Sequence, residues 1–201
     1  MLKQHTALSS GIVEQGEELD QYCIGNSVAF HHDICTGLPA VYKKCDVFFI
    51  EPPWKRGFDL FNARAKTPTA FTYLQFMAQL SGIIVSLNKP TYIITGKSEV
   101  KRLPAPNFIR QIKREGGVYL LAVYNSKNPI SAMFMPGDLL TTDMLLEQLG
   151  KQYNCVGDFF AGYGAAAVAF HKAGKEFVVS DFVKSCIGVI KSRVLEAGAK
   201  V

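Results

Sequence analysis

Short apolar runs and longer amphipathic segments alternate along the chain. The apolar runs are rich in β-branched and aromatic residues and stop at polar or turn-forming residues, which is typical of buried strands. They predict strands at residues 28–30, 46–51, 92–94, 155–160 and 177–180. Helical spacing of apolar residues predicts helices at 67–87, 142–152, 165–173 and 183–196. This alternation predicts an α/β fold with a largely parallel sheet, in which residues 1–201 form one domain.

Several other segments have weaker patterns. Residues 11–21 predict a short helix, with Tyr22 continuing its apolar side. A second short helix is predicted at 108–115, ended by two glycines. Residues 118–124 and 131–135 predict the two strands of a β-hairpin at the edge of the sheet.

The composition is that of an ordinary globular protein, with 48% hydrophobic and 19% charged residues. No apolar run has membrane-spanning length and the first residues lack an apolar signal core, so no membrane partner is expected. The five cysteines show no CxxC spacing, which favours reduced, mostly buried thiols and a cytoplasmic location. A net charge of +5 permits a polyanionic partner without requiring one.

The segment around which the chain is organised follows the strand at 46–51. The strand ends in two prolines, which cannot continue a sheet ladder, and an aromatic residue follows them. A carboxylate and a carbonyl at this point are hydrogen-bond acceptors suited to an exocyclic amine, and an indole ring can stack on the heterocycle that carries the amine. The alternative is a structural turn with an aromatic side chain packed beneath it. The candidate catalytic residues are Glu51, Pro52, Pro53 and Trp54.

The residues after Trp54 are basic and interleaved with phenylalanines and a glycine. Such a segment suits a mobile loop near phosphates, although a solvated surface loop fits the pattern equally well. The candidate nucleic-acid-binding residues are Lys55, Arg56, Arg64 and Lys66.

A second constellation lies between the predicted strand at 155–160 and the following helix. Two glycines separated by one residue allow a ligand to approach the backbone closely. Asp181 ends the next strand, where a carboxylate can accept hydrogen bonds from ribose hydroxyls. The alternative is a tight structural turn. The segment is not a phosphate-binding P-loop, because no Gly-Lys-Ser/Thr follows it.

Asp33 also follows a predicted strand, and His31 and His32 precede it. A His-His-Asp cluster invites a metal-site interpretation, but no further His or Cys lies at ligand spacing. The pattern therefore predicts no metal site.

Residues 158–164, Asp-Phe-Phe-Ala-Gly-Tyr-Gly, resemble the S-adenosylmethionine motif of DNA amino-methyltransferases, commonly Asp-Pro-Phe-x-Gly-x-Gly. Residues 51–54, Glu-Pro-Pro-Trp, resemble the catalytic motif of that family, (Asp/Asn/Ser)-Pro-Pro-(Tyr/Phe/Trp). The catalytic motif comes first, which is the permuted order of the beta class. The segment around Asp33 resembles the short Gly-Asp segment that begins such chains, and the resemblance extends over residues 27–198.

The resemblance implies a Rossmann-like class I methyltransferase sheet, mostly parallel with one antiparallel strand near an edge. The late strands that end at Phe160 and Asp181 would then pair beside the early strands that end at Asp33 and Glu51. It also implies that S-adenosylmethionine is the cofactor. The residues that would bind it are Asp33, Asp158, Phe159, Phe160, Gly162, Gly164 and Asp181.

The implied reaction is direct methyl transfer to a nucleobase amine, with N6 of adenine in DNA as the expected target. Three departures matter: Glu51 replaces the usual Asp, Asn or Ser, Phe159 replaces the usual proline, and the segment between Met135 and Thr142 is too short for a target-recognition domain. The resemblance therefore implies an enzyme of low sequence specificity, of the kind phages and mobile elements carry, or one that relies on a second subunit. Two alternatives stay open: an inactive subunit that binds nucleic acid or a partner, and an enzyme acting on cytosine N4 or on RNA.

Overall fold

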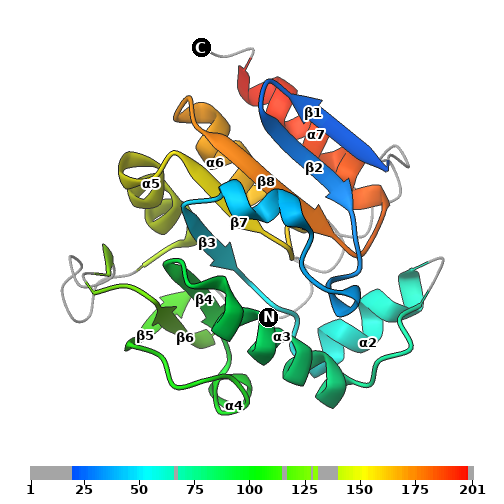
Figure 1. Cartoon of the computed structure of the whole chain (residues 1–201), viewed down its shortest axis with the longest axis vertical. Coiled ribbons are helices and arrows are strands. Elements are labelled where there is room, and N and C mark those ends of the chain that lie inside the picture. The colour runs from blue at the N-terminus through cyan, green and yellow to red at the C-terminus, as the bar shows by residue number, and fades with distance from the viewer. Residues whose placement is uncertain (1–19, 66–67, 115–116, 128, 131–139, 199–201) are drawn as a thin grey trace.

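The computed structural model describes residues 20–65, 68–114, 117–127, 129–130 and 140–198. One sheet runs through this part of the chain (Figure 1). Its strands are β1 (Gln21–Ile24), β2 (Ser27–His31), β3 (Val47–Ile50), β4 (Thr91–Thr95), β5 (Phe108–Arg114), β6 (Gly117–Tyr124), β7 (Cys155–Asp158) and β8 (Glu176–Asp181). The helices are α2 (Lys55–Arg64), α3 (Tyr73–Leu87), α4 (Lys97–Val100), α5 (Thr142–Gln152), α6 (Ala165–Lys172) and α7 (Ser185–Gly198), with 3-10 turns η1 (Ile34–Thr36) and η2 (Ala40–Lys44).

The strand order is β1-β2-β8-β7-β3-β4-β6-β5. The pairs from β2 through β8, β7 and β3 to β4 are all parallel, whereas β1 and β6 run antiparallel to their neighbours. The predicted α/β class and the largely parallel sheet are confirmed. The late strands β7 and β8 lie between the early strands β2 and β3, as the resemblance implied.

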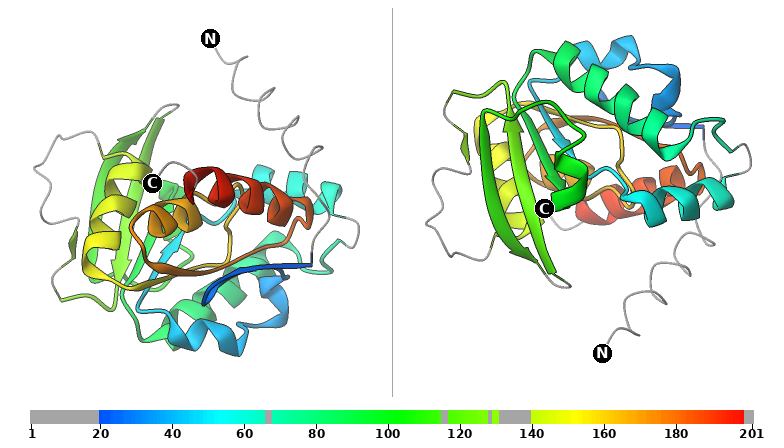
Figure 2. Two further views of the ribbon diagram at one scale, coloured as in Figure 1. Left: turned by 90° about the horizontal axis from the view of Figure 1, so that it is seen from above. Right: turned by 90° about the horizontal axis from the view of Figure 1, so that it is seen from below.

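Each central strand is buried on both faces. In β3 the side chains alternate between two cores: Val47 and Phe49 pack with helices α5, α6 and α7, while Phe48 and Ile50 pack with α3 and the 3-10 turns. Because both faces of these strands are buried, their sequences are continuous apolar runs and do not alternate between apolar and polar residues. Figure 2 shows the resulting layers, with α6 and α7 on one side of the sheet and α3 on the other.

The edge hairpin differs from the prediction. Residues 108–114 form β5 rather than a helix, and β5 pairs antiparallel with β6, so that Ile112 faces Tyr119. Phe108 and Ile112 pack on the same core. Two side chains that are four residues apart lie on one face of a strand, and they also lie on one face of a helix. The spacing therefore did not distinguish the two structures. The predicted partner strand at 131–135 lies outside the described residues.

One further prediction was wrong, and another is contradicted only at its last residue. The basic segment after Trp54 is the helix α2, not a loop, and Lys55 and Asp59 form an i,i+4 ion pair of 2.8 Å on it. The helix predicted at 11–21 lies mostly outside the described residues, but Gln21 and Tyr22 belong to β1. A two-residue turn of Gly25, with φ of 54°, and Asn26 joins β1 to β2. That dipeptide between alternating residues is a hairpin signal that the prediction missed.

The remaining predicted elements are confirmed within a few residues. Helix α3 begins later than predicted, at Tyr73, because Thr72 and Gln75 form a capping box there. No helix in the described ranges is long and apolar enough to span a bilayer. Four of the five cysteines are buried and all are free thiols, while Cys23 is exposed.

Candidate active site

Four carboxylates gather at one edge of the sheet. Asp33, Glu51, Asp158 and Asp181 lie at or just beyond the carboxyl ends of β2, β3, β7 and β8, which are four neighbouring parallel strands. Carboxyl ends of parallel strands meet at the same edge, and this edge is where open α/β sheets bind ligands. Figure 1 shows that α2 lies on the side to which the arrowheads of β2, β3 and β8 point.

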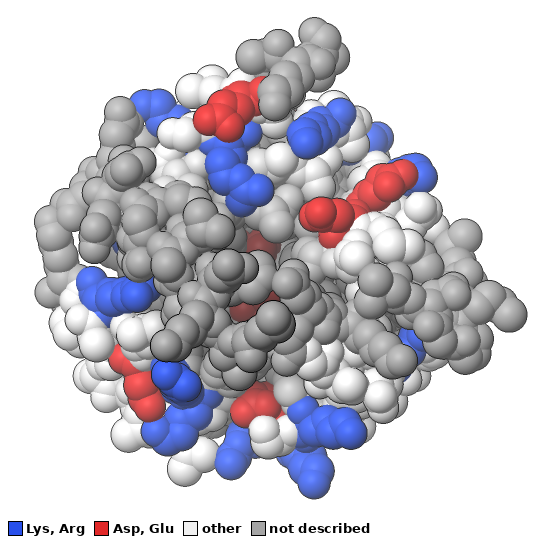
Figure 3. All heavy atoms as spheres, turned by 180° about the vertical axis from the view of Figure 1, so that it is seen from behind, with Lys and Arg blue, Asp and Glu red and all other residues white. Residues whose placement is uncertain are grey.

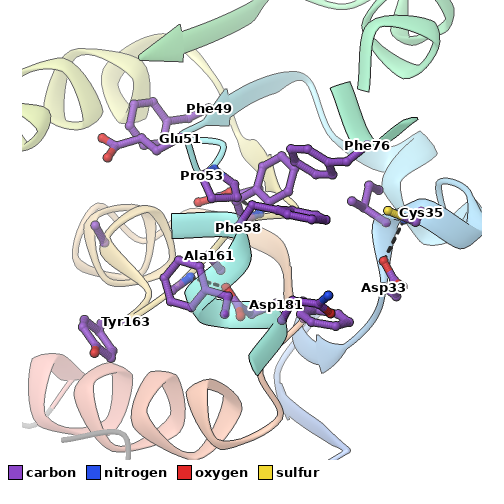
Figure 4. Close-up of a pocket in the computed structure, with 18 of the residues that line it drawn as sticks. Asp33, Cys35, Phe49, Glu51, Pro53, Phe58, Phe76, Ala161, Tyr163 and Asp181 are labelled. Carbon is purple, nitrogen blue, oxygen red and sulfur yellow. Dashed lines mark hydrogen bonds between the residues drawn. The ribbon is translucent and has the colours of Figure 1, made fainter. Parts of the chain in front are cut away.

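A cavity of about 420 Å³ opens at this edge, within the size range of small-molecule sites. All four carboxylates line it, and Asp143 adds a fifth. Its apolar wall is largely aromatic, formed by Phe49, Phe58, Phe61, Phe76 and Phe160. In Figure 4 Glu51 and Asp33 lie toward opposite ends of the cavity, and Asp181 lies between them.

The turn between β7 and α6 brings its backbone to the cavity. Gly162 has φ of 48°, and a Cβ added there meets nothing within 4 Å. Gly164 has φ of 79°, but a Cβ there would lie 2.8 Å from Cγ1 of Ile190 on α7. Both glycines adopt a conformation that side chains disfavour. Only the first leaves open space beside the cavity, whereas the second permits close packing of the turn against α7.

Asp158 is buried at the end of β7, with 4% of its surface exposed. Its Oδ1 accepts a hydrogen bond of 2.9 Å from the backbone N–H of Phe160. Burial, assisted by the nearby carboxylates of Glu51 and Asp181, raises its pKa well above the ordinary value. The neutral form of this carboxyl is therefore more favoured than it would be in water.

Asp181 ties two segments together. Its Oδ2 accepts from the N–H of Gly162 at 2.7 Å and its Oδ1 from the N–H of Val183 at 2.8 Å. Burial raises the pKa of Asp181, and these N–H groups oppose the increase. The carboxylate fixes the glycine turn relative to β8. The side chain of Cys186 also hydrogen-bonds to this carboxylate, whose two oxygens together can accept about four bonds.

Asp33 caps the turn η1, where its Oδ1 accepts from the N–H of Cys35 at 2.9 Å (Figure 4). Cys35 lines the same end of the cavity, and burial raises the pKa of its thiol to about 12. The histidines before Asp33 are engaged with backbone carbonyls: Nε2 of His31 lies 3.1 Å from Phe182 O, and Nε2 of His32 lies 2.7 Å from Gly37 O. Within the described ranges, no three His, Cys, Asp or Glu side chains are grouped to hold a metal ion.

The catalytic segment is divided between the cavity and the surface. Glu51 and Pro53 line the cavity, and Oε1 of Glu51 accepts a hydrogen bond of 3.1 Å from the hydroxyl of Thr142. Trp54 is 48% exposed and stacks on Tyr119 of β6, with ring centroids 5.8 Å apart and an interplanar angle of 19°. The lining residues include neither Pro52 nor Trp54. The sequence offered no signal for the stack, because its two rings are far apart along the chain.

The structure places Phe159 and Phe160 differently. Phe160 lines the cavity and makes an edge contact with Phe76 at 5.7 Å. Phe159 is buried in the core, against Tyr42 and Phe48. Both residues follow the end of β7, and in this bend the two neighbouring side chains point to different sides, one to the cavity and one to the core.

The candidate cations lie on the outside of α2. Lys55, Arg56 and Arg64 are exposed, and Lys66 lies outside the described residues. Figure 3 shows a face on which the coloured Lys and Arg side chains occupy several separate places, with Asp and Glu among them. The cavity itself is acidic, since Arg193 is the single Lys or Arg among its described lining residues.

Several cavity residues were not identified from the sequence. Thr142 and Asp143 begin α5, and the preceding Thr141 accepts from the N–H of Met144 as the helix cap. A Thr-Thr-Asp segment before an amphipathic helix is a capping signature, but it does not indicate a place in the cavity. The others come from η1, α2, α3, α6 and α7, from the segment between α2 and α3, and from the residue after β8: Ile34, Cys35, Phe58, Phe61, Asn62, Thr69, Phe76, Ala165, Phe182 and Arg193.

Comparison with solved structures finds similar folds at low sequence identity. The M1.HpyAVI–SAM complex matches with a TM-score of 0.55 and 14% identity, covering 83% of this chain and 98% of that one. M1.HpyAVI is also matched in a second structure, with a TM-score of 0.52, 16% identity and the same coverage of both chains. The cytosine-N4-specific PvuII DNA methyltransferase matches with a TM-score of 0.52 and 8% identity, covering 89% of this chain and 93% of that one.

The chain has the fold of class I methyltransferases. The match extends over most of both chains in each case, so the likeness concerns the whole sheet and its helices rather than one βαβ unit. Neither a protein-family model nor a curated protein sequence matches the chain.

Proposed function

We propose that this protein transfers a methyl group from S-adenosylmethionine to the exocyclic amine of a nucleobase, with N6 of adenine in DNA as the target. One observation carries the proposal: Glu51 and Gly162, from the two motif-like segments, line one cavity. The similar fold of a structure determined with SAM, and that of the PvuII DNA methyltransferase, support the choice of donor and of substrate class.

The cavity has the features that a cationic, adenosine-bearing donor needs. The open space at Gly162 admits a ligand against the backbone, and Asp181 is placed to accept from ribose hydroxyls. Asp33, at the far end, is an acceptor for an adenine amine, and Phe160 and Phe76 supply aromatic surface. Asp158 would bind near the positively charged end of the donor. Phe159 supports this site from the core, while Gly164 holds the turn against α7.

The donor, when bound, supplies a methyl group on a positively charged sulfur. The task left to the protein is to hold a weakly nucleophilic amine, whose lone pair is delocalised into its ring, in line with that methyl. Glu51 and the carbonyl of Pro52 would accept from the amine and stabilise positive charge that develops on its nitrogen. This catalysis is positional and electrostatic and needs no covalent intermediate with the protein.

The target base would reach this cavity by leaving a duplex stack or from a single strand. Trp54 would stack on the base, and Tyr119 would extend the aromatic surface behind it. Lys55, Arg56, Arg64 and Lys66 would bind backbone phosphates. We infer low sequence specificity, because the segment between Met135 and Thr142 is too short for a target-recognition domain, unless a second subunit supplies one.

Glu51 favours a second candidate function. Its side chain is one methylene longer than the aspartate common in the resembled motif, so the carboxylate can overshoot the amine. An inactive subunit that binds nucleic acid or a partner would lose nothing by this change, because it does not need to hold an acceptor amine. Cytosine N4 is a further possible acceptor, since its amine has the same geometry and the PvuII enzyme is specific for it.

The test is incubation with isotopically labelled S-adenosylmethionine and either plasmid DNA, in duplex and denatured forms, or RNA, followed by nucleoside analysis by mass spectrometry. The proposal expects labelled N6-methyladenine that disappears in Glu51→Ala. Labelled N4-methylcytosine would reassign the base. Binding of the donor without any labelled nucleoside from DNA or RNA would support the inactive subunit. Methylation that persists in Glu51→Ala would contradict the catalytic assignment.

A further inference from the structure

The carboxylate of Glu51 is held by a residue from another part of the chain. The hydroxyl of Thr142 donates to Oε1 of Glu51 at 3.1 Å. This bond joins the end of β3 to the first turn of α5, and both residues line the cavity. It is therefore a contact made inside the candidate active site.

Two consecutive threonines at the start of α5 have different tasks. The hydroxyl of Thr141 accepts from the N–H of Met144 at 3.1 Å and so caps the helix. The helix cap is already provided, so the hydroxyl of Thr142 is not required for it. It donates instead to the carboxylate of Glu51.

Glu51 has a particular need for such a contact. A glutamate has one more rotatable bond than an aspartate, so its carboxylate loses more freedom when it is fixed in one place. A donor on the opposite element limits this freedom by fixing one oxygen of the carboxylate.

We propose that Thr142 is a positioning residue that sets the carboxylate of Glu51 for the acceptor amine and compensates for the extra methylene. The inference rests on the proposed function for its consequence in catalysis. The bond and its effect on the carboxylate position can be tested without any reaction.

The kinetic test compares Thr142→Val, which removes the hydroxyl at nearly constant shape, with Thr142→Ser, which keeps it. Loss of a hydrogen bond to a charged group is worth roughly a 10- to 100-fold decrease in kcat. The expected KM for S-adenosylmethionine is unchanged, and Thr142→Ser recovers most of the rate. Thr141→Ala is the matched control, with a lower unfolding temperature and an unchanged kcat.

A double-mutant cycle makes the assignment specific. In a Glu51→Asp background the shorter carboxylate no longer reaches Thr142, so adding Thr142→Val should change kcat less than twofold. An equal decrease in both backgrounds would overturn the proposal, because Thr142 would then act independently of the Glu51 carboxylate.

Crystal structures of the wild type and the Thr142→Val and Thr142→Ser variants, without substrate, give a readout independent of activity. The proposal expects Glu51 to keep its carboxylate position in the serine variant and to leave it in the valine variant. An unchanged Glu51 in Thr142→Val overturns the proposal even if the enzyme is active. If the wild type transfers no methyl group, the proposed function fails while this structural comparison still decides the role of Thr142.

Discussion

Substitution of Gly162 by alanine should mainly weaken donor binding, whereas substitution of Gly164 by alanine should mainly lower the stability of the fold. Gly162 and Gly164 both have positive φ, so a side chain costs about 1–2 kcal/mol of conformational strain at either position. At Gly162 the added methyl enters open space beside the cavity. At Gly164 it would lie 2.8 Å from Cγ1 of Ile190, which adds about 1–3 kcal/mol of overpacking.

The two variants should therefore separate stability from binding. For a chain of this length, 1 kcal/mol shifts the unfolding temperature by about 2–4 °C. Gly164→Ala, at about 2–5 kcal/mol in total, should unfold roughly 4–20 °C lower, while Gly162→Ala should lose only about 2–8 °C. If the donor lies against Gly162, its methyl should weaken binding by about 1–3 kcal/mol, a roughly 5- to 150-fold increase in Kd.

The assay is thermal unfolding of both variants, followed by calorimetric titration of S-adenosylmethionine at a temperature where each is folded. Folded Gly164→Ala should bind the donor within threefold of the wild type. Wild-type affinity in Gly162→Ala would refute the placement of the ligand over this turn. Equal stability of the two variants would refute the packing argument.

Three further predictions concern the acid, the aromatic pair and the cations. Because burial raises the pKa of Asp158, the stability gained from its protonation is full below the unfolded pKa of about 3.9 and is lost as pH rises through the folded value. In urea unfolding, Asp158→Asn should therefore have a larger free energy of unfolding than the wild type at pH 8 and an equal one near pH 4. A difference between the two free energies that grows as the pH falls would contradict this. Tyr119→Leu should raise the KM for nucleic acid several-fold, because it removes the ring on which Trp54 stacks. Tyr119→Phe keeps the ring and should leave the KM unchanged. Equal KM values in the two variants would show that Trp54 and Tyr119 do not contact the nucleic acid. Arg56→Ala and Arg64→Ala should each lower the slope of log affinity for DNA against log salt by about one, and unchanged slopes would place the phosphates elsewhere.

The sequence was most informative about strands buried on both faces and the carboxylates that end them. All of β3 is apolar, and β8 contains the apolar run Phe177, Val178 and Val179, so both strands are recognisable without an alternating pattern. An acidic residue marks the end of each: Glu51 follows β3 and Asp181 ends β8. Which strands become neighbours was implied by the resemblance alone, because parallel pairing between distant segments has no local signal.

The errors arose where one local pattern fits two structures. Phe108 and Ile112 share a face in a strand as in a helix, and the charged segment after Trp54 has a single buried side chain, Phe58, to mark it as a helix. The site depends further on contacts between distant elements, such as that of Glu51 with Thr142. Such contacts depend on the folded arrangement and cannot be predicted from spacing.

The most direct test of the proposed active site is a crystal structure of the protein grown with S-adenosylmethionine. The expected result has the adenosyl group between Asp33 and Gly162, the ribose at Asp181 and the methyl group directed toward the carboxylate of Glu51. A donor bound at another surface, or bound here with its methyl directed away from Glu51, would contradict the proposal that the two strand ends form one methyl-transfer site.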